Sequence, residues 1–391
     1  MFTALNDVGK RVCALDFKEK HVLQAHKRNS IFYCPVCKSL VVLKSGEKRL
    51  PHFAHRKDMS CKGGSEPEST YHLQGKLQIY RKLQDLGLKP VLEPYFPSIK
   101  QRGDIGVMWQ DSYYVIEFQC SSIPVSSMQK RTEQYQKENF EPIWILGYKN
   151  VKLSKNISRL SAFQTAFLIP FKGEYILPAY CPSQESFYIL HNLIPITKEK
   201  IMASIAKLQL EVVTLYEQPV NLHSSFPYCD WQSAIHNQKN KHIHYHSKDN
   251  ERFLRELYKS GVHPHILPTA IGIPLKEGIR LLTPPLIWQA YLYIDCFGPN
   301  QQKIVSLHKI YDDFHNRIKR KDIEVRKLPN IIHGDWKAAV NNYLKKLIEM
   351  KVVEEVRPAF FKWIEDVCQY SDSIAKQEKD FYFRMRRGGL Q

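Results

Sequence analysis

The stretch 104–119 constrains the fold most, because two strand-like runs in it are separated by only three residues. In the second run apolar and polar residues alternate, and Tyr114, Ile116 and Phe118 fall on one side of a β-strand. Residues 110–112 then form the turn of an antiparallel hairpin. One face of this hairpin is therefore suited to a hydrophobic core, and the other face is polar.

The polar face carries Asp104, Glu117 and Gln119. A turn at 110–111 places Asp104 opposite Glu117, whereas a turn at 111–112 places Asp104 opposite Gln119, and a three-residue turn would put them on opposite faces. Two carboxylates on one face repel each other unless a cation lies between them, and such oxygen ligands suit Mg²⁺ or Mn²⁺. The alternative is an ordinary solvated polar face.

Helical patterns flank the hairpin on both sides. Ser69 or Thr70 can cap a helix that runs to Leu86, where Gly87 follows directly. The order predicted for this part of the chain is α-β-β-β-α-β. Its later members are strands at 90–96, 104–109 and 113–119, a helix at 126–139 and a strand at 142–147.

Charge and cysteine content narrow the class of partner and the compartment. Lys and Arg number 57 against 39 Asp and Glu, a formal net charge of +18, which favours contact with a phosphate backbone. We expect no membrane span, because no run of about 20 apolar residues occurs, and no signal peptide. Nine cysteines, mostly scattered, fit free thiols in a reducing cytoplasm.

A Cys-His pattern near the start of the chain predicts a metal site. Cys34 and Cys37 form a C-x2-C pair, and His52 and His55 follow fourteen residues later, which suits tetrahedral Zn²⁺. Cys61 can replace one histidine. We predict a structural zinc ribbon or knuckle; the alternative is that the cysteines are small core residues.

The length of 391 residues predicts several domains. We expect an N-terminal module over 1–65, a core over 66–150, a connecting region of unclear fold over 151–280 and a helical, basic region over 281–391. Residues 62–67 are expected to be a linker, and 200–218 and 250–260 to be helical. A helix at 336–350 followed by a short strand at 352–356 is typical of winged-helix modules.

A resemblance to a known family rests on motifs that occur in order from residue 1 to about 148. The sequence resembles the CoiA-like competence proteins, which serve natural transformation in bacteria. The matching motifs are Cys34-Pro35-Val36-Cys37, Pro51-His52-Phe53-Ala54-His55, Glu68-Ser69 with His72 and Lys76, Glu93, Arg102-Gly103-Asp104-Ile105, Ile116-Glu117-Phe118-Gln119-Cys120-Ser121, Arg131-Thr132 with Tyr135, and Ile143-Trp144-Ile145-Leu146.

The resemblance implies a restriction-endonuclease-like core of the PD-(D/E)XK type. The chain is then an α+β, multi-domain protein with a zinc-ribbon-like N-terminal module and a mainly helical C-terminal region. It also implies that Asp104 and Glu117 are metal ligands, and that Gln119 stands where most such nucleases carry lysine. The implied setting is incoming single-stranded DNA, near recombinase loading, with recombination and DNA-uptake proteins as partners.

A lysine at position 119 would supply positive charge and orient water, whereas a glutamine can only hydrogen-bond to water. Lys76, Arg131 and Lys130 are the cations that can compensate, and Glu93 is a further candidate metal ligand. Glu68, His72 and Tyr135 are candidates for orienting ligands or phosphate. Two functions follow: a metal-dependent nuclease acting on DNA, or a non-catalytic DNA-binding or recombinase-loading factor. An RNA-binding protein with a zinc knuckle is a third.

Overall fold

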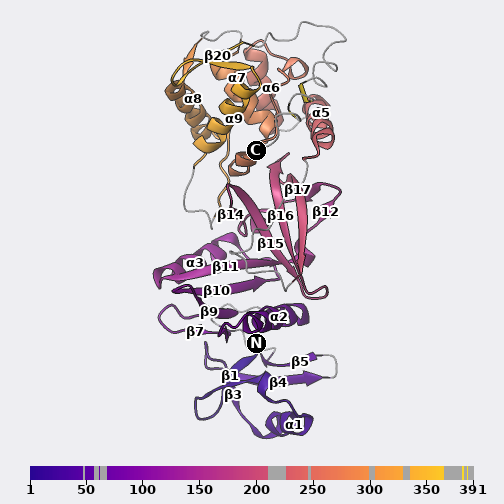
Figure 1. Ribbon diagram of the computed structural model, residues 1–391, viewed down its shortest axis with the longest axis vertical. Helices are drawn as coiled ribbons and strands as arrows, with labels where there is room; N and C mark the ends of the chain where they lie inside the picture. The colour runs from indigo at the N-terminus through magenta and orange to yellow at the C-terminus, as the bar shows by residue number, and fades with distance from the viewer. Residues whose placement is uncertain are drawn as a thin grey trace.

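The computed structural model describes residues 1–46, 49–56, 61, 68–209, 226–244, 248–298, 304–328, 335–364, 381–382 and 385. The molecule is elongated, with the N-terminal sheet at one end, a large sheet in the middle and a helical region at the other end (Figure 1). The expected linker at 62–67 lies outside the described residues. Among the described helices, none combines the length and apolarity needed to cross a bilayer.

The N-terminal part is a small antiparallel sheet with one helix beside it. The strand order is β2-β1-β3-β4-β5. A small core that includes Phe32, Val41, Leu43 and Phe53 lies against this sheet. Its elements are β1 (Thr3–Leu5), β2 (Arg11–Cys13), the 3-10 helix η1 (Ala14–Asp16), α1 (Lys20–Asn29), β3 (Phe32–Tyr33), β4 (Leu40–Gly46) and β5 (Arg49–His55).

A ten-stranded mixed sheet forms the centre of the molecule. Along it the strands follow the order β12-β13-β17-β16-β15-β11-β10-β9-β6, and β14 pairs with β15. The first half of its strands are β6 (Val91–Leu92), β9 (Ile105–Trp109), β10 (Ser112–Gln119) and β11 (Phe140–Gly147), and a separate two-stranded ribbon is formed by β7 (Tyr95–Phe96) and β8 (Gln101–Arg102).

The expected hairpin is formed by β9 and β10. Ser112 pairs with Trp109 and Ile116 with Ile105, so the turn comprises only two residues. Gln110 and Asp111 both have positive φ, 45° and 63°, as a type I′ turn requires. The structure thus adopts the first of the three turns considered, and Asp104 and Glu117 directly flank the last pair, Ile105 with Ile116.

Helices α2 (Thr70–Asp85) and α3 (Val125–Lys137) pack on opposite faces of this sheet. The Ser69 hydroxyl caps α2 by accepting from the His72 N–H. Gly75 lies in the middle of α2, where glycine is unfavourable for a helix. A Cβ at this position would overlap the ring of Phe118, so glycine allows α2 to approach β10 closely.

The central sheet continues past residue 150, where the sequence suggested a boundary. β11 pairs in parallel with β15 through Leu146 and Gly147, which joins the two halves. The remaining strands are β12 (Leu153–Ser154), β13 (Ile157–Arg159), β14 (Ile169–Phe171), β15 (Glu174–Cys181), β16 (Ser186–Pro195) and β17 (Lys200–Gln209), with η2 (Tyr148–Asn150) and α4 (Ala162–Thr165) among them.

The helix expected at 200–218 is wrong over its first half, because residues 200–209 form strand β17. This segment pairs with β16 along its length, and sheet pairing overrides its helical propensity. The rest of the expected helix lies outside the described residues. The helix expected at 250–260 is present as α6 (Lys248–Lys259).

The C-terminal part is built mainly from helices around a large hydrophobic core, which includes Trp231, Trp288 and Tyr343. A small sheet of order β18-β20-β19 closes one side. The elements are α5 (Tyr228–His244), α6, η4 (Pro264–Ile266), η5 (Lys276–Arg280), α7 (Pro285–Cys296), β18 (Val305–Ser306), α8 (Leu307–Lys319), α9 (Lys337–Glu349), β19 (Val353–Arg357) and β20 (Phe360–Trp363).

The contact between α2 and β10 leads to a stability prediction. Gly75→Ala should lower the free energy of unfolding by about 1–3 kcal/mol, because overpacking against Phe118 outweighs the gain of about 1 kcal/mol in helix propensity. Gln74→Ala, at the exposed neighbouring position of the same helix, should change it by less than about 0.5 kcal/mol. Urea denaturation measures both values, and an equally stable or stabilised Gly75→Ala protein would contradict the proposed close packing.

Candidate functional site

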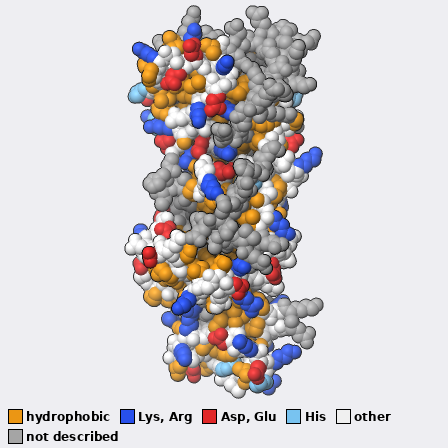
Figure 2. Space-filling model, in the orientation of Figure 1, with side chains coloured by type: hydrophobic (Ala, Val, Ile, Leu, Met, Phe, Trp, Pro, Cys, Tyr) orange, Lys and Arg blue, Asp and Glu red, His pale blue; other side chains and the backbone are white. Residues whose placement is uncertain are grey.

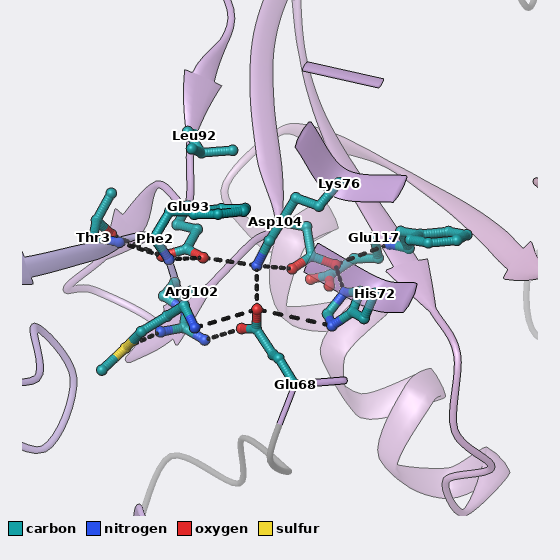
Figure 3. Close-up of polar contacts among 12 residues, drawn as sticks. Phe2, Thr3, Glu68, His72, Lys76, Leu92, Glu93, Arg102, Asp104 and Glu117 are labelled. Carbon is teal, nitrogen blue, oxygen red and sulfur yellow. Dashed lines mark hydrogen bonds and ion pairs between the residues drawn. The ribbon is translucent and has the colours of Figure 1, made fainter. Parts of the chain in front are cut away.

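A buried lysine lies at the centre of a cluster of charged side chains. The Lys76 ammonium group is fully buried and contacts three carboxylates, at 2.7 Å from Glu68 Oε2, 2.7 Å from Glu93 Oε1 and 3.2 Å from Asp104 Oδ1 (Figure 3). Burial by itself would lower the pKa of Lys76, but the three carboxylates raise it above its ordinary value. Lys76 is therefore charged at all physiological pH values.

Asp104 directly precedes β9, and both of its oxygens have partners. Oδ1 faces Lys76, and Oδ2 accepts hydrogen bonds from the Phe118 N–H and from His72 Nε2, each at 3.0 Å. Burial opposes ionisation of Asp104, but Lys76 and His72 hold its pKa well below the usual range. This carboxylate is ionised.

Glu117 belongs to β10, and its side chain meets helix α3. Oε1 accepts a hydrogen bond from the buried Tyr135 hydroxyl at 2.6 Å and forms an ion pair with Arg131. Burial and the charge of Asp104 raise the pKa of Glu117 to about 7, against the opposing effect of Arg131. The two carboxylates of the hairpin thus differ in their proton affinity, because one faces a buried lysine and the other is more weakly compensated.

Glu93 links the core to the N-terminal sheet. Its carboxylate accepts hydrogen bonds from the Phe2 N–H at 2.7 Å and from the N–H and hydroxyl of Thr3, each at 2.9 Å. Burial opposes ionisation, but Lys76 and neighbouring cations lower the pKa of Glu93 to about 2. The carboxylate of Glu93 therefore holds β1 against the core (Figure 3).

A pocket of about 640 Å³ lies beside Asp104 and Glu117. Its wall includes Val36 and Cys61 from the N-terminal part, so the pocket lies between that part and the core. Side chains of both signs of charge line the pocket. The charged and amide side chains that line it are Glu68, Lys100, Gln101, Arg102, Asp104, Glu117, Gln119, Lys130, Arg131, Gln134 and Lys149.

Gln119 lines this pocket, and its amide group donates a hydrogen bond to the Ser121 carbonyl at 2.8 Å. Three cations of the site, Lys100, Arg102 and Lys149, were not anticipated from the sequence. Arg102 binds Glu68 at 3.0 Å, and Lys149 lies in the 3-10 helix η2 that follows β11. Because β10 and β11 are parallel, their carboxyl ends share an edge of the sheet, and this edge brings Lys149 and Gln119 to one pocket.

The structure also gathers four possible metal ligands in the N-terminal part. Cys34, Cys37, His55 and Cys61 offer ligand atoms that all lie within 4.8 Å of one another. The Cys34–Cys37 turn is closed by hydrogen bonds from the Cys34 N–H to Ser39 O and from the Lys38 N–H to Cys34 O. Three thiols and one imidazole are compatible with binding of a metal ion.

The ring of His52 is not part of this group, and its Nδ1 lies 2.8 Å from the Leu50 carbonyl. His52 and His55 are both in strand β5, where residues three apart point to opposite faces. Only one of the two histidines can therefore face the cysteines. Cys61 occupies the fourth place, which is the substitution the sequence left open.

Three models of known protein-family domains match the chain. The family model described as the nuclease-like domain of competence protein CoiA matches residues 68–219. Models described as the N-terminal and C-terminal domains of the same protein match residues 15–63 and 226–368. The candidate site and the Cys-His group therefore lie in two matched domains, and the large central sheet falls within the nuclease-like one.

The chain belongs to the competence protein CoiA family. It is 32% identical over 286 residues to a protein named competence protein CoiA from Bacillus subtilis (strain 168), an alignment covering 70% of this chain and 75% of that protein. No solved structure matches the chain. The family assigned by resemblance from the sequence motifs is confirmed.

The Cys-His group leads to a prediction about bound metal. Cys61→Ser should weaken metal binding by more than about tenfold, because it removes one of four ligands, whereas His52→Ala should retain the metal. Metal per chain is measured by elemental analysis, and affinity by competition with a chromophoric chelator. Equal losses in both variants would contradict the assignment of Cys61 in place of His52.

A second prediction concerns Lys76. Lys76→Met should lower the free energy of unfolding by about 3–5 kcal/mol, because three buried carboxylates lose their shared counter-charge. Lys82→Met, one and a half turns further along the same helix, removes the same charge from a site without this cluster and should have a small effect. Thermal and urea denaturation provide the measurement, and a Lys76→Met protein as stable as the wild type would show that the cluster is not a stabilising centre.

Proposed function

We propose that this chain is a competence-associated deoxyribonuclease of the PD-(D/E)XK type, which cleaves incoming single-stranded DNA in the bacterial cytoplasm with a divalent cation. The observation that carries the proposal is that Asp104 and Glu117, each directly before or after the last β9–β10 pair of Ile105 with Ile116, line one pocket. The match to a nuclease-like domain supports the same reading.

The donor atoms of the site fit Mg²⁺ or Mn²⁺. Asp104 offers a carboxylate that is ionised, and all hydrogen bonds of Glu117 to described residues use Oε1, so Oε2 is available as a ligand. A divalent cation held there would activate water and stabilise the negative charge that develops on a phosphodiester. Glu93 is not proposed as a ligand, because its carboxylate is used by Phe2, Thr3 and Lys76.

The neighbouring side chains have distinct proposed roles. Lys76 supplies, at 3.2 Å from Asp104, the positive charge that Gln119 cannot provide. Gln119 positions water from the wall of the pocket through its amide. His72 and Tyr135 orient the two carboxylates through hydrogen bonds to Asp104 and Glu117.

The rim of the pocket is suited to a phosphate backbone. Lys100, Lys130, Arg131 and Lys149 bring cations to the wall opposite or beside the acidic pair. Elsewhere Lys and Arg are interspersed with Asp and Glu at every level of the visible face (Figure 2). We propose that a single strand follows this rim, because a flexible strand can bend into a pocket between two parts of the protein. The Cys-His group, with Zn²⁺ as its proposed metal, would hold the N-terminal wall in place.

A non-catalytic DNA-binding or recombinase-loading factor is the second candidate function. The observation that favours it is that Lys76, His72 and the Phe118 N–H already occupy both oxygens of Asp104. A cation would then have to share or displace these partners. In this case the pocket would bind DNA and recruit recombination or DNA-uptake proteins without cleaving the strand.

Isosteric variants separate the two functions. Asp104→Asn and Glu117→Gln should each reduce Mg²⁺- or Mn²⁺-dependent cleavage of single-stranded DNA by at least about 100-fold while changing DNA affinity only a few-fold. Asp111→Asn and Glu141→Gln, which remove exposed carboxylates from the same hairpin and the next strand, serve as controls and should cleave normally. Cleavage is followed on end-labelled oligonucleotides. Equal rates in the Asp104 variant and the wild type would remove the catalytic claim, and absence of cleavage in all proteins would favour the second function.

A further inference from the structure

The last part of the described chain has the connectivity of a winged helix-turn-helix. Along the chain the order is helix α7, short strand β18, helices α8 and α9, and the hairpin β19–β20. Both pairings in the small sheet are antiparallel, and β20 lies between β18 and β19. The first strand therefore pairs with the last, which closes the three helices and the hairpin into one unit. The sequence had suggested such a module only from a helix followed by a strand.

The six elements share one hydrophobic core, which also includes Trp231 of α5 and Met202 of β17. Residues from all six elements are buried in this core, among them Trp288 of α7, Phe314 of α8 and Tyr343 of α9. The ring of Trp288 packs edge-on against both Phe314 and Tyr343, at centroid distances of 5.9 and 5.3 Å. Val305 and Phe361 bring the sheet into the same core.

Backbone hydrogen bonds attach the hairpin to the helices. The Leu307 N–H at the start of α8 donates to Ala359 O in the β19–β20 turn, at 2.8 Å. The Val352 N–H donates to Leu347 O of α9 at 2.9 Å, so β19 begins directly where α9 ends. The connection between α8 and α9 spans 320–336, longer than the tight turn of the simplest helix-turn-helix proteins.

Helix α9 has one buried side and one exposed polar side. Val340, Tyr343, Leu344 and Leu347 are buried. The exposed side follows a spacing of four residues and carries Lys337, Asn341 and Lys345. The Lys345 side chain is 77% exposed. Lys337 lies over the Tyr311 ring at 5.3 Å, and Asn341 accepts a hydrogen bond from the Tyr311 hydroxyl, so α8 supports this face from the side.

Two further features fit a nucleic-acid ligand. Arg357, in the exposed part of the β19–β20 hairpin, stacks over the Phe360 ring at 3.8 Å, which places a cation on the wing. Acidic groups flank the surface at Asp335 and Glu349, the two ends of α9, and at Glu354 and Glu355 on β19. On the exposed face of α9, Asn341 lies between Lys337 and Lys345, and Lys345 is 4.0 Å from Glu349. Two lysines and an amide are groups that can contact phosphates and base edges.

We propose that this winged-helix unit is a second DNA-binding surface, which takes double-stranded DNA with α9 in the major groove and the β19–β20 hairpin beside it. Lys337 and Lys345 contact phosphates, and Asn341 faces the base edges. The surface lies in the helical region at the end of the molecule, away from the pocket between the N-terminal part and the core (Figure 1). A protein with both surfaces can hold a duplex while a single strand occupies the pocket. The inference does not depend on cleavage in that pocket.

The test uses the full chain with Asp104→Asn, so that the DNA remains intact whatever the pocket does. Fluorescence anisotropy measures binding of a short labelled duplex and of the matching single strand over a range of salt concentrations. Lys337→Ala/Lys345→Ala should weaken duplex binding about 10- to 100-fold and reduce the slope of log affinity against log salt by about 2, because two phosphate contacts are lost. Single-strand binding should change much less.

A matched control removes the same two charges elsewhere. Lys20→Ala/Lys27→Ala changes two exposed lysines of α1, at the other end of the molecule, and should retain duplex affinity. Circular dichroism and thermal melting establish that both double variants fold like the parent. An unchanged duplex affinity and salt slope in the α9 variant would overturn the proposal, as would an equal loss in the α1 control.

Discussion

The burial of the Lys76 ammonium group is the constraint on which the rest of the site depends. A charge removed from water needs close counter-charges, and here three carboxylates meet it from separate parts of the chain. Glu93 in turn binds the backbone of β1, so the same cluster fixes the N-terminal sheet against the core. One side chain of α2 thereby positions both the acidic hairpin and the wall of the pocket that faces it.

This arrangement gives the two acidic groups of the hairpin unequal characters. Asp104 lies beside Lys76 and keeps its negative charge, whereas Glu117 is paired with Arg131, and burial together with the charge of Asp104 raises its pKa to about 7. Pairs of acids whose environments separate their proton affinities are typical of sites that carry out chemistry. The difference arises from the two helices, because residues of α2 contact Asp104 and residues of α3 contact Glu117.

Local patterns in the sequence sufficed for the hairpin and its two helices, because alternation and capping act between near neighbours. Candidates such as Glu68, Glu93 and Tyr135 came from the family resemblance. The spacing H-x2-H did not show that only His55 joins the Cys-His group. Both histidines lie in strand β5, where residues three apart point to opposite faces. Strand β17 was missed because its pairing partner β16, and not its own composition, decides its conformation. Lys149 reaches the site through the parallel pairing of β10 with β11, which no local spacing encodes.

Cys61 belongs to the Cys-His group and also lines the pocket. If the Cys-His group holds a metal ion as proposed, a chelator that removes this ion would also release the wall of the pocket. A loss of the proposed cleavage after chelation would then not by itself report on the carboxylate pair. Oxidation of the thiol during purification would have the same effect. Samples for cleavage assays therefore require a reductant. The proposed metal ion of the Cys-His group should also be restored before Mg²⁺ or Mn²⁺ is titrated.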